Sequence, residues 1–230
     1  MRHTEQVLVF DADDTLWENN VVFERVIDDY LDWLAHPTLG KTELRAVLDH
    51  VERANSAVHG YGTRIFLRSL RECFEKLRER PATEPERREI LALADALINH
   101  RVELIPGVAE TLDELRGRHH LLLLTKGDTE EQQRKIDASG LAGHFESVHI
   151  VPEKHAGIYL RLVGQHGWTP TDAWMIGNSP ASDIQPARQA GMNAVFIPND
   201  NTWTLEGCEL DPADNRVLRL DRFPDLLRHF

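Results

Sequence analysis

The sequence is poor in cysteine, in long apolar runs and in clustered basic residues. Its 230 residues include two cysteines, Cys73 and Cys208, which lie far apart and form neither a zinc-binding pattern nor a framework of secreted disulfides. The formal net charge is -12 and no basic block occurs, which argues against nucleic acid as a partner because a phosphate backbone binds to a basic face. No long apolar run follows Met1, so we expect no membrane segment and a location in the cytoplasm.

The first hundred residues divide into a short strand and a long helical stretch. Residues 6–10 are apolar, rich in β-branched and aromatic side chains, and run into carboxylates, which predicts a buried parallel strand followed by a polar loop. From residue 20 to about residue 100, apolar side chains recur at helical spacing in four stripes. The fourth stripe opens at Thr83, with Glu86 three residues later as a capping box. Four amphipathic helices without a strand predict a small helical bundle.

After Leu104 the pattern changes to strands that alternate with helices. The predicted strands are residues 120–124, 147–151, 173–177 and 193–197. This alternation predicts a doubly wound, Rossmann-like parallel sheet, so the helical stretch is an insertion after the first strand. We therefore assign residues 1–18 and 101–230 to an α/β core and residues 19–100 to an inserted helical cap. The tail from Pro198 is predicted to be irregular, with a short closing helix near residues 223–229.

Polar side chains follow the first four of the five predicted strands. In an open α/β sheet the ligand binds outside the carboxyl ends of the strands, where these side chains would converge. The set consists of Asp11, Asp13, Thr125, Lys154, Asn178 and Asp183. Carboxylates and an amine suit an anion that is bound through a divalent cation.

The chemistry of these groups suggests a role for each. A carboxylate such as Asp11 can attack phosphorus and divide one difficult step into two through an aspartyl-phosphate. Asp13 can protonate the leaving oxygen and later activate the hydrolytic water. Thr125 can hydrogen-bond a phosphoryl oxygen, and Lys154 can neutralise charge on the nucleophile and the phosphate.

The order of these residues resembles that of the haloacid dehalogenase superfamily of phosphohydrolases. Its first motif is similar to the run from Asp11 to Leu16, and its later motifs are similar to Thr125, Lys154 and the run from Gly177 to Asp183. The insertion after the first strand is similar to the helical cap of the family. The resemblance implies that Asp11 is the nucleophile, that Asp13 is the acid/base, and that Thr125 and Lys154 bind the phosphoryl group. It also implies Mg²⁺ as the cofactor, held by Asp11, the backbone carbonyl of Asp13, Asn178 and Asp183.

Three residues extend or depart from this pattern. Asn178 stands where the family usually has aspartate, and an amide oxygen can coordinate magnesium but brings no charge. Lys126 follows Thr125 at a position where many members of the family have asparagine. Two orientations of its side chain stay open, one toward the substrate and one toward the solvent. Trp17 adjoins the nucleophile loop and is a candidate for lining the mouth of the pocket.

The function expected from the sequence is a phosphatase that acts on a small phosphorylated metabolite. One alternative is a 2-haloacid dehalogenase, which shares the aspartate nucleophile but lacks a second aspartate, so Asp13 favours phosphoryl chemistry. A phosphomutase and a non-catalytic binding protein on the same scaffold are further alternatives. Neither the substrate nor the choice between a monomer and a homodimer follows from the sequence.

Overall fold

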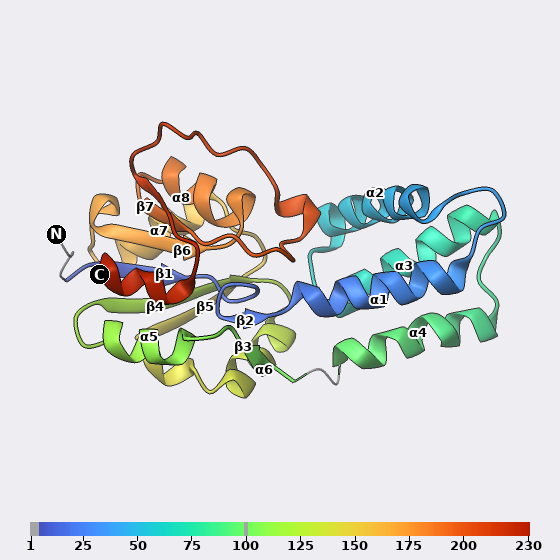
Figure 1. Cartoon of the computed structure of the whole chain (residues 1–230), viewed down its shortest axis with the longest axis horizontal. Coiled ribbons are helices and arrows are strands. Elements are labelled where there is room, and N and C mark those ends of the chain that lie inside the picture. The colour runs from blue at the N-terminus through green and yellow to red at the C-terminus, as the bar shows by residue number, and fades with distance from the viewer. Residues whose placement is uncertain (1–4, 99–100) are drawn as a thin grey trace. The chain divides into compact units, whose positions relative to one another are not determined.

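The chain forms two compact units. A computed structural model describes residues 5–98 and 101–230, and it divides the chain into residues 1–20 with 102–230 and residues 21–101 (Figure 1). The predicted divisions lie after residues 18 and 100. Residues 99 and 100, at the second division, lie outside the described residues.

The larger unit is built on a parallel sheet of six strands in the order β5-β4-β1-β6-β7-β8. Its strands are β1 (Val7–Phe10), β4 (His120–Lys126), β5 (Ser147–Val151), β6 (Ala173–Gly177), β7 (Asn193–Phe196) and β8 (Val217–Arg219). β1 lies at the centre and pairs with β4 on one side and with β6 on the other. The chain fills one half of the sheet through β4 and β5 and then crosses to β6, so the strand order reverses beside β1. The predicted doubly wound sheet is confirmed.

Helices cover both faces of this sheet, as Figure 1 shows. On one face lie α5 (Val108–Leu115), α6 (Thr129–Ser139) and a closing 3-10 helix, η5 (Phe223–Arg228); on the other lie α7 (Ala156–Gln165) and α8 (Gln185–Gln189). Leu8 and Phe10 of β1 pack into the first layer, whereas Val7 and Val9 pack into the second. Because both faces of β1 are buried, the strand is continuously apolar, and each such side chain contributes about 1.5–3 kcal/mol.

Three short strands were not predicted. β2 (Trp17–Glu18) and β3 (Glu103–Leu104) form an antiparallel pair, and β8 pairs in parallel with β7. The prediction of an irregular tail is therefore wrong for Val217–Arg219, although the closing helix is present as η5. Segments of two or three residues are too short to show a periodicity, and pairing with a neighbouring strand is what makes them extended.

The smaller unit is helical. It contains most of α1 (Asn20–Leu34), together with α2 (Lys41–His59), α3 (Thr63–Arg78) and α4 (Glu84–Ile98), around one apolar cluster. Tyr30 is buried in this cluster and satisfies its hydroxyl by donating to the carbonyl of Leu70 at 2.8 Å. The predicted start of the fourth helix is confirmed, because the Glu86 carboxylate accepts the backbone N–H of Thr83 at 2.8 Å. Within the described parts of the chain, no helix has the length and apolar character needed to span a membrane.

Candidate active site

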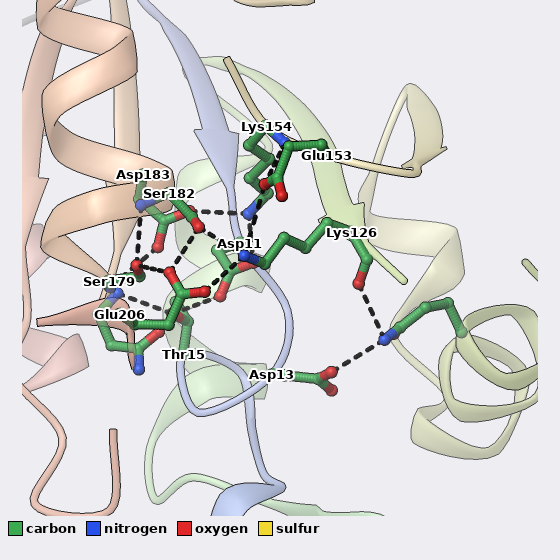
Figure 2. A network of polar contacts seen from close by, with 12 residues as sticks. Asp11, Asp13, Thr15, Lys126, Glu153, Lys154, Ser179, Ser182, Asp183 and Glu206 are labelled. Atoms are coloured by element: carbon green, nitrogen blue, oxygen red, sulfur yellow. Dashed lines mark hydrogen bonds and ion pairs between the residues drawn. The ribbon is translucent and has the colours of Figure 1, made fainter. Parts of the chain in front are cut away.

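Asp11 follows β1 directly and is held by two donors. Its backbone N–H donates to the carbonyl of Ile176 at 2.9 Å, so the loop leaves the sheet at this residue. Its Oδ1 accepts from Lys154 Nζ at 2.5 Å and its Oδ2 accepts from the Thr15 hydroxyl at 3.1 Å (Figure 2). The carboxylate is therefore buried in a fixed orientation at the carboxyl end of the central strand.

Lys154 joins Asp11 to a second buried carboxylate. Its Nζ also donates to Asp183 Oδ1 at 2.7 Å, and the side chains of Lys154 and Asp183 are each 1% exposed. Burial acts to lower the pKa of Lys154, but the charges of both aspartates outweigh it, so this pKa lies above its ordinary value. Burial and the charge of Asp11 raise the pKa of Asp183 to about 7, although Lys154 opposes the rise. Two carboxylates thus share one ammonium group, which leaves an excess of negative charge.

The fourth motif brings Asp183 back to the end of β6. A Cβ on Gly177 would lie 2.1 Å from Asp183 Oδ2, so only glycine permits this approach. The sequence predicts a single helix after β6. The structure instead has a π-helical turn (Pro180–Ile184), and only the short α8 that follows it is α-helical. Ser179 precedes the turn, and its backbone N–H donates to Asp183 Oδ2 at 3.0 Å. The π-helical turn is wider than an α-helical one and returns Asp183 to the end of β6. The apolar periodicity of the sequence does not reveal such a turn.

The oxygens at this edge of the sheet suit a magnesium ion. The Thr15 hydroxyl lies 3.1 Å from both Asp11 Oδ2 and Asn178 Oδ1, so a carboxylate oxygen and an amide oxygen contact the same hydroxyl. Within residues 5–98 and 101–230, no group of three His, Cys, Asp or Glu side chains is arranged to hold a metal. The side chains of Asp11, Asn178 and Asp183 offer only oxygen ligands, and the two carboxylates bring an excess of negative charge. Oxygen ligands with negative charge are what Mg²⁺ prefers. The residues present therefore fit the metal; the contribution of the Asp13 carbonyl stays a prediction.

The Asp13 side chain is placed apart from that of Asp11. Figure 2 shows its carboxylate pointing away from Asp11. It accepts from Lys135 Nζ, which lies 2.7 Å from Oδ1 and 2.6 Å from Oδ2. Gln132 Nε2 donates to Oδ2 at 2.9 Å, and Trp17 Nε1 donates to Oδ1 at 2.7 Å. Burial acts to raise the pKa of Asp13, but Lys135 and these hydrogen bonds outweigh it, so this pKa lies below its ordinary value. The acid/base role of Asp13 stays a prediction.

The three residues predicted to bind phosphate or substrate lie at the same end of the sheet. Thr125 is buried on β4, in register with Ile150 of β5. Trp17 is only 1% exposed and its indole supports Asp13, so it does not lie open at a pocket mouth. Lys126 turns away from solvent, and its Nζ donates to Ser182 Oγ at 2.7 Å. Contact of these three residues with substrate stays a prediction.

Glu206 is part of the site and was missed. It ends a 3-10 turn, η4 (Thr204–Glu206), in the tail that was predicted to be irregular. Its carboxylate accepts from Lys126 Nζ at 2.5 Å, from Ser182 Oγ at 2.5 Å and from the Ser179 hydroxyl (Figure 2). Burial acts to raise the pKa of Glu206, but Lys126 and the two serines outweigh it and lower the pKa. No local sequence pattern distinguishes this glutamate from a solvated one.

Comparison with known proteins assigns the family. The sequence profile of a haloacid dehalogenase-like hydrolase matches residues 5–191. A phosphoserine phosphatase of Thermus thermophilus is 34% identical over 130 residues, which are 54% of this chain and 52%, about half, of that protein. The N-acylneuraminate-9-phosphatase of Homo sapiens is 27% identical over 206 residues, covering 85% of this chain and 83% of that protein.

A solved structure supports the same assignment at the level of the fold. A haloacid dehalogenase-like family hydrolase from Xanthomonas campestris superposes with a TM-score of 0.81 at 24% identity, covering 98% of this chain and 95% of that one. The resemblance inferred from four motifs is confirmed by the family profile, which spans all four of them. The chain belongs to the haloacid dehalogenase-like hydrolases.

Proposed function

We propose that the chain is a magnesium-dependent phosphohydrolase that cleaves a small phosphorylated metabolite through an aspartyl-phosphate on Asp11. The observation that supports this most directly is the buried Asp11 carboxylate, oriented by Lys154 and Thr15 beside the oxygens of Asn178 and Asp183. Two relatives are named as phosphatases of phosphoserine and of N-acylneuraminate 9-phosphate, which supports a phosphate monoester as the substrate.

In the first step an Asp11 oxygen attacks phosphorus, and the bond from phosphorus to the substrate oxygen breaks. A displacement of this kind places the attacking and leaving oxygens on opposite sides of phosphorus. An acid that serves the leaving oxygen therefore has to stand away from the Asp11 carboxylate, as the Asp13 side chain does. Asp13 gives its proton to the leaving oxygen, and the negative charge of the bound phosphate favours the protonated form of Asp13 beforehand.

In the second step water attacks phosphorus, gives a proton to Asp13, and the bond from phosphorus to Asp11 breaks. Lys154 remains charged throughout and offsets charge on Asp11 and on the phosphoryl oxygens. A magnesium ion held by Asp11, Asn178 and Asp183 would reduce the repulsion between carboxylate and phosphate.

The test is hydrolysis of an aryl phosphate with and without magnesium. We expect turnover that requires magnesium and that is abolished by Asp11→Asn, whereas Asp221→Asn, at an exposed aspartate, should leave the rate unchanged. Turnover that survives Asp11→Asn would contradict the nucleophile assignment. Release of halide from 2-chloropropionate without magnesium, and without phosphate hydrolysis, would support the dehalogenase alternative instead. A panel of phosphorylated metabolites would then identify the substrate.

A further inference from the structure

Asp13 is held by donors on both of its carboxylate oxygens. Lys135 Nζ bridges the two oxygens at 2.7 and 2.6 Å, Trp17 Nε1 donates to Oδ1 at 2.7 Å, and Gln132 Nε2 donates to Oδ2 at 2.9 Å. The ion pair is largely shielded, with 13% of the Lys135 side chain and 22% of the Asp13 side chain exposed. Donors on both oxygens fix the rotation of the carboxylate as well as its position, because a rotation would break at least one short hydrogen bond.

The helix that carries two of these donors is itself firmly placed. Asp128 caps α6 by accepting the backbone N–H groups of Glu130 and Glu131, each at 3.1 Å. Ile136 anchors the helix in the apolar cluster beneath the sheet. Gln132 and Lys135 are three residues apart, so they lie on the same side of α6 and reach Asp13 together.

The backbone before α6 is shaped to let Gln132 reach Asp13. Gly127 has a φ of 142°, and a Cβ there would lie 2.9 Å from Gln132 Nε2. The same Nε2 also donates to the carbonyl of Lys126 at 3.2 Å, which ties Gln132 to the end of β4. Gln132 is thus held between Asp13 and the strand that precedes α6.

We propose that Lys135 and Gln132 are positioning residues that hold the Asp13 carboxyl where it exchanges protons with the leaving oxygen and with water. This inference rests on the proposed phosphohydrolase function. In this role the two residues act through Asp13, to which both donate, rather than on the substrate itself. A correctly placed acid accelerates such a step by about 10²- to 10⁴-fold, and displacement by about 1 Å removes much of that effect.

The dependence of the rate on the leaving group separates this role from a structural one. We would measure kcat/KM for 2,4-dinitrophenyl phosphate, whose phenolate leaves without a proton, and for phenyl phosphate, whose leaving oxygen needs one. For Lys135→Met we expect kcat/KM to fall by about 10²-fold on phenyl phosphate and by less than about 3-fold on dinitrophenyl phosphate. Lys135→Arg, which keeps the charge and the donors, should recover part of the loss. Arg134→Met, which removes an exposed charge from the same helix, should change neither value.

Each outcome decides between specific alternatives. Equal losses on the two phosphates, or no loss on phenyl phosphate, would overturn the positioning role while leaving the phosphohydrolase function intact. Hydrolysis of neither phosphate by the wild-type protein would overturn the proposed function, and the inference with it. Circular dichroism would check that each variant folds, and Gln132→Leu provides the same comparison with a smaller change if Lys135→Met does not fold.

Discussion

Replacement of Lys154 by methionine tests the electrostatic account of the site. Methionine keeps the length and most of the volume of the side chain but removes its charge. The Lys154 Nζ lies 2.5 Å from Asp11 and 2.7 Å from Asp183, and its side chain is 1% exposed. Removal of one partner from a buried ion pair leaves an uncompensated charge and costs about 3–5 kcal/mol. We expect the free energy of unfolding to fall by about that amount, together with loss of activity.

A second substitution makes this prediction sharper. If the cost arises from two carboxylates left without a cation, removal of one carboxylate should recover part of it. The double variant Lys154→Met with Asp183→Asn should therefore be more stable than Lys154→Met alone, although it carries one more substitution. Arg116 offers a control in the same unit, since it also pairs with a carboxylate, that of Asp113 at 2.9 Å, but its side chain is 53% exposed. Arg116→Met should leave the unfolding midpoint nearly unchanged.

The assay is urea unfolding followed by tryptophan fluorescence. Four of the five tryptophans, Trp17, Trp168, Trp174 and Trp203, belong to the unit that contains Lys154, and only Trp33 belongs to the helical unit. The signal therefore reports mainly on the unit that is perturbed. A loss below about 1 kcal/mol for Lys154→Met would refute the view that this lysine offsets buried charge. A double variant less stable than the single one would refute it as well.

Three further substitutions test other parts of the site. Asn178→Asp should lower the magnesium concentration needed for half-maximal activity, because it adds a negative charge at a metal-binding oxygen; an unchanged value would remove Asn178 from the metal site. Glu206→Gln should lower the free energy of unfolding by about 1–3 kcal/mol at pH 7, in urea titrations. Since the pKa of Glu206 is lowered in the folded protein, that difference should persist above about pH 4.5 and narrow as the pH falls further. Gly177→Ala should abolish aryl phosphate hydrolysis, because a Cβ there displaces Asp183.

The part of the site that the sequence predicted consists of residues adjacent to buried strands. Asp11 follows β1, Thr125 lies at the end of β4, and Asn178 follows β6, and the order of the strands in the sheet places all three at one edge. The rule that ligands bind at the carboxyl ends of parallel strands was therefore enough to group them. The buried strands themselves were predictable because their side chains are apolar on both faces.

The partners of these residues were not predictable, for a physical reason. Lys135 is 122 positions from Asp13, and Glu206 is 80 positions from Lys126. In the sequence, Lys135 is one of several polar residues on a helix, and nothing local distinguishes the side that faces Asp13 from the side that faces solvent. Side-chain partners over such separations depend on how the elements pack, which the periodicity of a single segment does not contain.

Thr202 lies in the tail, beyond the stretch that matches the family profile, and it fixes the orientation of the Asn178 side-chain amide. The motifs alone leave this orientation open. An amide side chain has one accepting and one donating end, and Asn178 Nδ2 donates to Thr202 Oγ1 at 2.9 Å. This bond turns Asn178 Oδ1 toward the Thr15 hydroxyl, 3.1 Å away, which also lies 3.1 Å from Asp11 Oδ2. An aspartate at this position would present an oxygen in either orientation and would need no such partner. If Asn178 holds the proposed magnesium ion, its orientation therefore depends on Thr202. A chain with all four motifs but without a hydrogen-bond acceptor at position 202 would let the amide adopt two orientations, and in one of them the Nδ2 group would take the place of the oxygen.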